Sequence, residues 1–170
     1  MPRPRLATPE DAPRLAALVR GLEVFRAEEA PAATEARLRA LLELPCGASL
    51  WVAEDDAGAM LGYALVFWHP QLFAARPTAY LAELFVAPEA RGRGAGHALV
   101  GAAVRAAKAR GCRRMQLIAM RERASYRRGF YPKLGFVERP EAADFVLPLQ
   151  QVSPGQRDTP AAQPRSGRRS

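Results

Sequence analysis

The feature that most constrains the fold is the segment from Tyr80 to Met120. It begins with the apolar run YLAELFVAP and continues through the glycine-rich stretch RGRGAG. An Ala/Leu/Val-rich run, expected to be a helix to about Arg110, then stops at Gly111 before the strand-like sequence RMQLIAM. A strand, a crossover helix and a second strand in this order belong to an α/β sheet. The centre of the chain is therefore predicted to be a strand–loop–helix crossover.

Elements before this crossover are predicted by periodicity and turn residues. A strand at RPRLAT is followed by a helix at TPEDAPRLAALVRGL, in which Thr8 can cap and Pro9 takes the first helical position. A second helix is expected in APAATEARLRALLEL, with Thr34 as its cap. The runs SLWVAED and MLGYALVFWH flank the turn residues DAG and read as a hairpin.

Elements after the crossover complete the expected domain. A short helix around SYRRGFYPKLG precedes a last strand or two in FVERPEAADFVLPL. The expected architecture is α/β, with a mixed central sheet of about six to seven strands flanked by about four helices. Within YLAELFVAP, strict alternation would put Leu81, Glu83 and Phe85 on one face of the sheet.

The domain is expected to span residues 1–149 and to be followed by a disordered basic tail at 150–170. The tail QQVSPGQRDTPAAQPRSGRRS contains almost nothing to bury and carries four arginines against one aspartate. A chain of 170 residues with 49% hydrophobic residues is long enough for one domain with a real core.

The net charge of +8 raises the question of a nucleic-acid partner. Part of that excess lies in the tail, and no interleaved aromatic platform or recognition helix accompanies it. We therefore expect no nucleic-acid partner. No apolar run is long enough to span a membrane and no secretory signal opens the chain, so a cytoplasmic protein is expected. Cys46 and Cys112 have no metal-ligand spacing and are expected to be free, buried thiols, with no metal site.

The glycine-rich stretch is typical of a loop that binds pyrophosphate. Where such a loop opens a helix, backbone N–H groups and the helix N-terminus converge on the anion, and absent side chains allow close approach. A packing role for the glycines at a helix start is the alternative. The segment lacks the Gly-Lys-Ser/Thr of a nucleotide-triphosphate loop, and it does not follow the first strand as a dinucleotide site would require.

Two motifs resemble those of the GNAT N-acetyltransferases. The segment Arg91–Gly96 is similar to that family's Arg/Gln-x-x-Gly-x-Gly/Ala motif. It comes directly after LFVAPEA, as the family's motif comes after the fourth strand. FYPKLGF, at Phe130–Phe136, is similar to the family's FYEKLGF at the expected distance. The resemblance covers roughly residues 3–148 and implies the GNAT fold.

The resemblance also implies where acetyl-CoA would be held as co-substrate. The edge of the strand at Leu84, Phe85 and Val86 is implied to pair with the pantetheine arm and to polarise the thioester carbonyl. The pyrophosphate is implied to lie on the loop, whose residues are Arg91, Gly92, Arg93, Gly94, Ala95, Gly96 and His97.

Two residues are candidates for the chemistry of acetyl transfer. Glu83 precedes the loop in an apolar strand and is the candidate base that accepts the amine proton, directly or through water. A substrate anchor and a scaffold carboxylate are its alternatives. Tyr131 matches the motif tyrosine and is the candidate donor to the departing thiolate, with a packing role as its alternative.

The sequence departs from many relatives before this tyrosine. Ala124 and Arg127 stand where those relatives have Asn and Ala, and the Asn helps to hold the pantetheine. Nearby arginines that could reach a CoA phosphate are Arg121, Arg123, Arg127 and Arg128.

The function expected from sequence is acetyl-CoA-dependent transfer of an acetyl group directly to a primary amine of a small molecule or peptide. A diamine or polyamine acetyltransferase is an alternative, because YLAELFV is similar to YLEDLFV of that branch, although Ala82 replaces one of its acids. Glu23, Glu28 and Glu29 are candidates to attract a cationic amine, and a solvated acidic loop is their alternative. A non-catalytic acyl-CoA-binding regulatory module is the other alternative. Homodimers are common among the relatives, so a homodimer is considered.

Overall fold

The computed structural model describes residues 1–20, 31–43 and 47–149. The strands are β1 (Arg3–Leu6), β2 (Ala48–Glu54), β3 (Met60–His69), β4 (Thr78–Val86) and β5 (Arg114–Gln116). The helices are α1 (Ala12–Arg20), α2 (Pro31–Leu42), α3 (Ala95–Ala109) and α4 (Ala124–Arg127). Short 3₁₀ turns lie at Pro9–Asp11, Pro88–Ala90 and Pro132–Leu134. In these described segments, no helix combines the length and apolar character that crossing a membrane requires.

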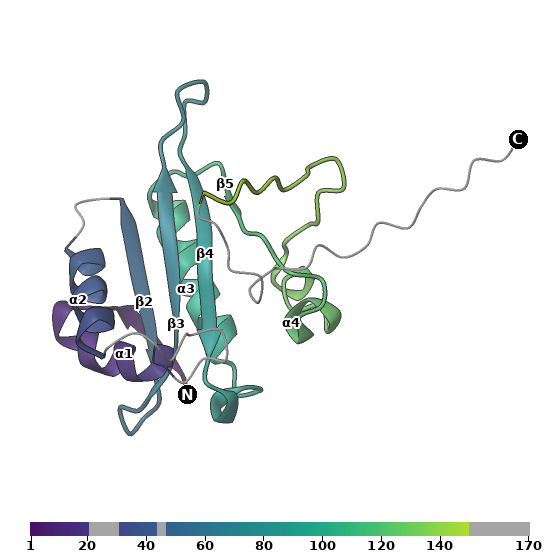
Figure 1. Cartoon of the computed structure of the whole chain (residues 1–170). Helices are drawn as coiled ribbons and strands as arrows, with labels where there is room; N and C mark the ends of the chain where they lie inside the picture. The colour runs from purple at the N-terminus through teal and green to yellow at the C-terminus, as the bar shows by residue number, and fades with distance from the viewer. Residues whose placement is uncertain (21–30, 44–46, 150–170) are drawn as a thin grey trace, which may run out of the picture.

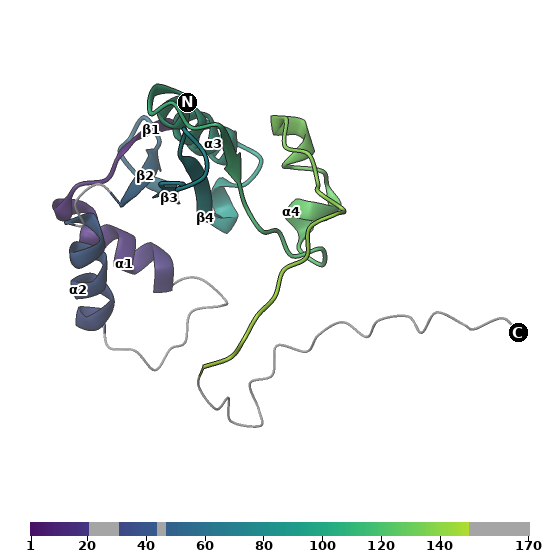
Figure 2. The same cartoon turned by 90° about the horizontal axis from the view of Figure 1, so that it is seen from above.

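The strands form one mixed sheet in the order β1-β2-β3-β4-β5 (Figure 1). The pairs β1–β2, β2–β3 and β3–β4 are antiparallel, and the pair β4–β5 is parallel. This arrangement confirms the α/β fold, the β2–β3 hairpin and the crossover through α3. Seen from above, α1 and α2 lie on one side of the sheet, α3 on the other, and α4 beyond β5 (Figure 2).

Two apolar layers hold these elements together. On the α3 side, Leu99 and Val100 of the helix pack in one cluster with Val66 and Leu81 of the sheet. On the opposite side, a second cluster is centred on five buried residues, Leu15, Leu50, Val52, Tyr63 and Leu65. Both faces of β3 are therefore covered, which explains its nearly continuous apolar sequence.

A β-bulge interrupts β4 at Ala82. Leu65 lies opposite Glu83 and the next residue, Val66, lies opposite Leu81, so Ala82 is the extra residue. Leu81 consequently packs on the α3 side, whereas Glu83 turns to the side of Tyr63. The expectation that Leu81, Glu83 and Phe85 share one face is wrong at Leu81, because the bulge breaks the alternation there.

The C-terminal part of the domain differs most from expectation. The sheet has five strands over the described residues, fewer than the six to seven expected, because 136–149 forms none. Pro140 and Pro148 each lack the N–H that a central ladder needs. Glu138 accepts hydrogen bonds from Arg121 and from Tyr126 of α4, at 2.6 and 2.7 Å, which ties this segment to α4.

Other boundaries differ in smaller ways. The strand expected at 114–120 is confined to Arg114–Gln116, and α2 begins at Pro31 rather than at a cap on Thr34. The helix α3 ends as expected, since Gly111 adopts a positive φ of 68° just beyond it. Cys112 is a free, half-buried thiol, while Cys46 and the tail at 150–170 lie outside the described residues.

An ion-pair network fastens the N-terminal strand to the sheet. Arg5 of β1 donates to both carboxylate oxygens of Asp11, at 2.6 and 2.8 Å, and also to Glu54 of β2. The backbone N–H of Thr8 donates to Asp11 at 2.9 Å. These hydrogen bonds, above all those from Arg5, lower the pKa of the buried Asp11 carboxyl to about 2.

We expect Asp11→Asn to destabilise the fold by about 2 kcal/mol at pH 7, because the folded protein favours the ionised carboxylate. The pKa of Asp11 is lower in the folded state than when unfolded, so this stabilisation is present above pH about 4 and is lost as the pH falls toward 2. Urea unfolding at pH 7 and at pH 2.5 measures the difference. Asp56→Asn is the control, since Asp56 is exposed and should show little effect.

Candidate active site

A large cleft opens where β4 and β5 separate. The two strands pair only from Thr78 to Tyr80 of β4, opposite Arg114–Gln116. From Ala82 to Val86 the edge of β4 that faces β5 has no strand beside it in the described chain, and these residues line a cleft of about 1350 Å³. The start of α3 and the segments around α4 form the other walls. A backbone edge open to a cleft can accept an extended ligand by hydrogen bonding.

The glycines of the loop have two different physical roles. Gly92 and Gly94 adopt positive φ angles of 79° and 85°, a region that side chains disfavour, and Gly94 is the N-cap of α3. Gly96 is needed for packing instead, because a Cβ there would lie 3.1 Å from the Phe130 ring and 3.6 Å from Val86. Backbone conformation therefore explains Gly92 and Gly94, and packing explains Gly96.

The backbone N–H groups of residues 92–97 are available to a ligand. None of the six donates to a backbone carbonyl within the described part of the chain, whereas the next N–H, that of Ala98, donates to Gly94 at 3.0 Å. The loop and the first turn of α3 thus present a run of unpaired donors at the positive end of the helix dipole. Such a run of donors suits a diphosphate, and binding of the cofactor by these residues stays a prediction.

The charged side chains of the loop differ in whether they line the cleft and in what they contact. Arg91 lines the cleft, but its Nε donates to the carbonyl of Val86 at 3.3 Å, so part of its guanidinium is already engaged. Arg93 is exposed. The imidazole of His97 packs edge-on against Phe130, with ring centroids 5.5 Å apart.

Of the four arginines considered as phosphate ligands, two line the cleft and two do not. Arg123 and Arg128 line the cleft, whereas Arg121 is paired with Glu138. Arg127, which replaces the smaller family residue, is exposed and does not line the cleft. Lys133, which was not singled out from sequence, lines the same wall.

Glu83 and Tyr131 both line this cleft. Glu83 is exposed to the cleft and its Oε2 accepts a 2.7 Å hydrogen bond from the hydroxyl of Tyr63. Tyr131 is half-buried, and its ring is held edge-on between Phe130 and Phe136. Burial raises the pKa of Tyr131, so its hydroxyl remains protonated at neutral pH.

The model of the acetyltransferase (GNAT) family matches residues 17–136. The chain belongs to the GNAT acetyltransferase family. This result confirms the resemblance read from the two sequence motifs, and acetyl-CoA is the co-substrate of that family. GNAT enzymes act on amines of various sizes, so membership by itself leaves the acceptor open.

Solved structures with similar folds carry varied names. A transcriptional regulator from Bacillus halodurans C-125 is 25% identical, with a TM-score of 0.73 over 86% of this chain and 100% of that one. A ribosomal-protein-alanine N-acetyltransferase from Brucella melitensis is 18% identical, with a TM-score of 0.72 over 88% and 100%. An aminoglycoside acetyltransferase from an uncultured soil metagenomic sample is 18% identical, with a TM-score of 0.70 over 88% and 97%. No curated protein matches the sequence.

Tyr63 is a second site residue of this GNAT domain, besides Lys133, that the sequence analysis did not single out. It lies on the hairpin strand β3, directly opposite Phe85, and the centroids of the two rings are 6.1 Å apart. Burial, followed by the charge and hydrogen bond of Glu83, raises the pKa of Tyr63 well above its usual value, so it donates to Glu83 throughout the working pH range. Its only sequence signal was a tyrosine in an otherwise apolar strand.

We expect Tyr63→Phe to lower kcat about tenfold while leaving the KM for acetyl-CoA unchanged. The substitution keeps the packing on Phe85 but removes the hydrogen bond that holds the Glu83 carboxylate, and a misplaced base loses rate rather than cofactor affinity. Steady-state kinetics with varied acetyl-CoA separates the two constants. Tyr126→Phe is the matched control, because it also removes a tyrosine–glutamate hydrogen bond, here to Glu138 outside the cleft. A normal kcat in Tyr63→Phe would exclude this positioning role.

Proposed function

We propose that the protein is an acetyl-CoA-dependent N-acetyltransferase that transfers the acetyl group directly to a primary amine of a small molecule or peptide. One observation carries the proposal: the free β4 edge, the loop with unpaired N–H groups, Glu83 and Tyr131 all line one continuous cleft. The first two features suit an extended ligand that ends in a diphosphate. The other two supply an acceptor and a donor of protons beside it.

The proposed cofactor contacts follow from this geometry. Acetyl-CoA supplies an activated acetyl group when bound. The backbone edge at Leu84, Phe85 and Val86 holds its pantetheine arm and aims an N–H at the thioester oxygen. A donor aimed at a developing oxyanion lowers the activation free energy by on the order of 3 kcal/mol. The loop N–H groups, with Arg123, Arg128 and Lys133 on the facing wall, bind the phosphates.

The proposed chemistry assigns separate roles to Glu83 and Tyr131. Glu83 accepts a proton from the bound ammonium, directly or through a water molecule, which leaves a neutral amine as the nucleophile, and Tyr63 keeps the carboxylate oriented. Tyr131, protonated because burial raises its pKa, donates a hydrogen bond to the departing thiolate. The neutral amine nitrogen then attacks the acetyl carbon and forms a tetrahedral intermediate. Its collapse breaks the carbon–sulfur bond, and the second proton lost by the nitrogen goes to the departing thiolate, which gives the amide and the free thiol of CoA.

Release of free thiol from acetyl-CoA, measured against a panel of amines, tests this function. The panel should contain alkylamines, polyamines, amino acids, aminoglycosides and peptide N-termini, with calorimetric titration of CoA in parallel. Amine-dependent thiol release with CoA binding supports the proposal. Tight CoA binding without release from any amine would favour the regulatory module, and absence of CoA binding would contradict the assignment of the loop.

A further inference from the structure

The acceptor side of the cleft is built from aliphatic side chains. Glu83 and residues of α1 and α2 line it, and these two helices lie on one side of the sheet (Figure 2). In the sheet, Leu65 is directly opposite Glu83 and Leu50 is directly opposite Leu65, so an apolar row begins at the carboxylate. The helices add further aliphatic residues to this side, namely Leu15, Val19, Leu38 and Leu41.

Two polar features of this wall restrict the acceptor further. Among the described residues, Glu83 is the carboxylate that lines the cleft, and it provides a counter-charge for the ammonium of the acceptor. Thr34 also lines the cleft, and its side chain is 3% exposed with its Oγ1 lacking a hydrogen-bond partner. A buried hydroxyl without a partner is costly, and a bound ligand with a polar atom would relieve that cost.

We propose that the acceptor is a primary amine carried on an apolar body, with its amine at Glu83 and its body on the half-buried Val19, Leu38 and Leu41, which pack against the buried Leu65 and Leu50. This inference rests on the proposed acetyl transfer and names the substrate class of the same site. A polyamine would place a second ammonium against leucines, and an aminoglycoside would bury hydroxyl groups there, so both are disfavoured. Glu23, Glu28 and Glu29, the acidic residues that the sequence offers as an attraction for a cationic amine, lie outside the described residues.

Alkylamines of increasing length test the wall directly. From butylamine to hexylamine, kcat/KM should rise about fourfold for each methylene that becomes buried. Hexylamine should exceed 1,6-diaminohexane by about tenfold or more, because the two differ only in a second ammonium that the wall cannot solvate. A flat response to chain length, or a diamine as good as the monoamine, would overturn the proposal.

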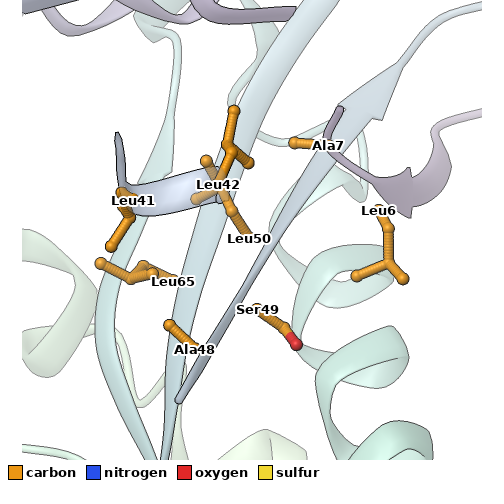
Figure 3. A pocket seen from close by; sticks show the side chains of 8 residues that line it. All are labelled: Leu6, Ala7, Leu41, Leu42, Ala48, Ser49, Leu50 and Leu65. Atoms are coloured by element: carbon orange, nitrogen blue, oxygen red, sulfur yellow. The ribbon is translucent and has the colours of Figure 1, made fainter. Parts of the chain in front are cut away.

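A pair of leucines on one helix provides a matched control. Leu38 and Leu42 of α2 are both half-buried, but Leu38 lines the cleft, whereas Leu42 lines a separate cavity of about 170 Å³ beside it (Figure 3). Leu38→Ala should flatten the dependence of kcat/KM on chain length, and Leu42→Ala should leave it intact. Equal effects of the two variants would contradict the assigned wall.

Thr34→Val tests the buried hydroxyl without making a cavity. Removal of an unpartnered polar group should raise the melting temperature by a few degrees. The same change should lower kcat/KM for 6-aminohexanol relative to hexylamine, because the acceptor hydroxyl loses its partner. A lower melting temperature, or an unchanged ratio, would show that Thr34 does not serve the acceptor.

The failures of the two proposals are distinguishable. If CoA does not bind and no amine gives thiol release, acetyl transfer itself is wrong. If hydrophilic amines react and alkylamines do not, acetyl transfer stands and the apolar acceptor is wrong.

Discussion

Glu83→Gln is expected to lower kcat/KM for the amine by about 100-fold or more while leaving CoA affinity unchanged. The amide keeps the size of the side chain and can still interact with the Tyr63 hydroxyl, but it cannot accept a proton from the bound ammonium. Initial rates at saturating acetyl-CoA and calorimetric titration of CoA measure the two quantities.

The pattern of the loss distinguishes the three roles considered for Glu83. A general base gives a fall in kcat, a substrate anchor gives a rise in the amine KM with kcat nearly unchanged, and a scaffold carboxylate gives a lower melting temperature. Glu89→Gln removes the same charge from an exposed position near the loop that does not line the cleft, so it should be active. Full activity of Glu83→Gln would remove Glu83 from the mechanism.

Gly94→Ala is expected to weaken CoA binding about tenfold or more. Gly94 has a φ of 85°, where an L-residue costs on the order of 1–2 kcal/mol. No neighbouring atom lies within 4 Å of an added Cβ, so the strain acts on the backbone itself. A loop that relaxes this strain turns its N–H groups away from the phosphates, and charge-assisted hydrogen bonds of about 1.5–3 kcal/mol each are lost.

Gly58→Ala is the matched control for that loop variant. Gly58 has a φ of 80° and equally open surroundings, but it lies in the β2–β3 turn and does not line the cleft. Both variants should lose similar stability in urea unfolding, and Gly94→Ala alone should lose CoA affinity. Equal CoA affinity in the two proteins would show that the loop does not hold the cofactor.

The sequence predicted the crossover and its loop because their signals are local. A strand, closely spaced glycines and a helix that stops at glycine depend on neighbouring residues only, and β4, α3 and the loop between them appear where expected. The side-chain environment of Glu83 was not predictable in the same way. It depends on the bulge at Ala82 and on the register with β3, which brings Tyr63 to the carboxylate.

The end of the domain shows the opposite limit of sequence reasoning. The run FVERPEAADFVLPL has the composition of a strand, but strands need a neighbour as well as a composition. The edge strand β5 is only three residues long and offers a following strand a short ladder, and Glu138 is held by Arg121 and Tyr126. Competition from these contacts has no signature in the local sequence.

Mass spectrometry of a single reaction mixture tests the central claim most directly. The protein, acetyl-CoA and hexylamine are incubated, and the masses of the amine and of the intact protein are measured together. Direct transfer predicts one acetyl group on the amine, loss of that product in Glu83→Gln, and no acetyl group on the protein. Acetyl held covalently on the protein during turnover would contradict direct transfer, and unmodified hexylamine would contradict the apolar acceptor.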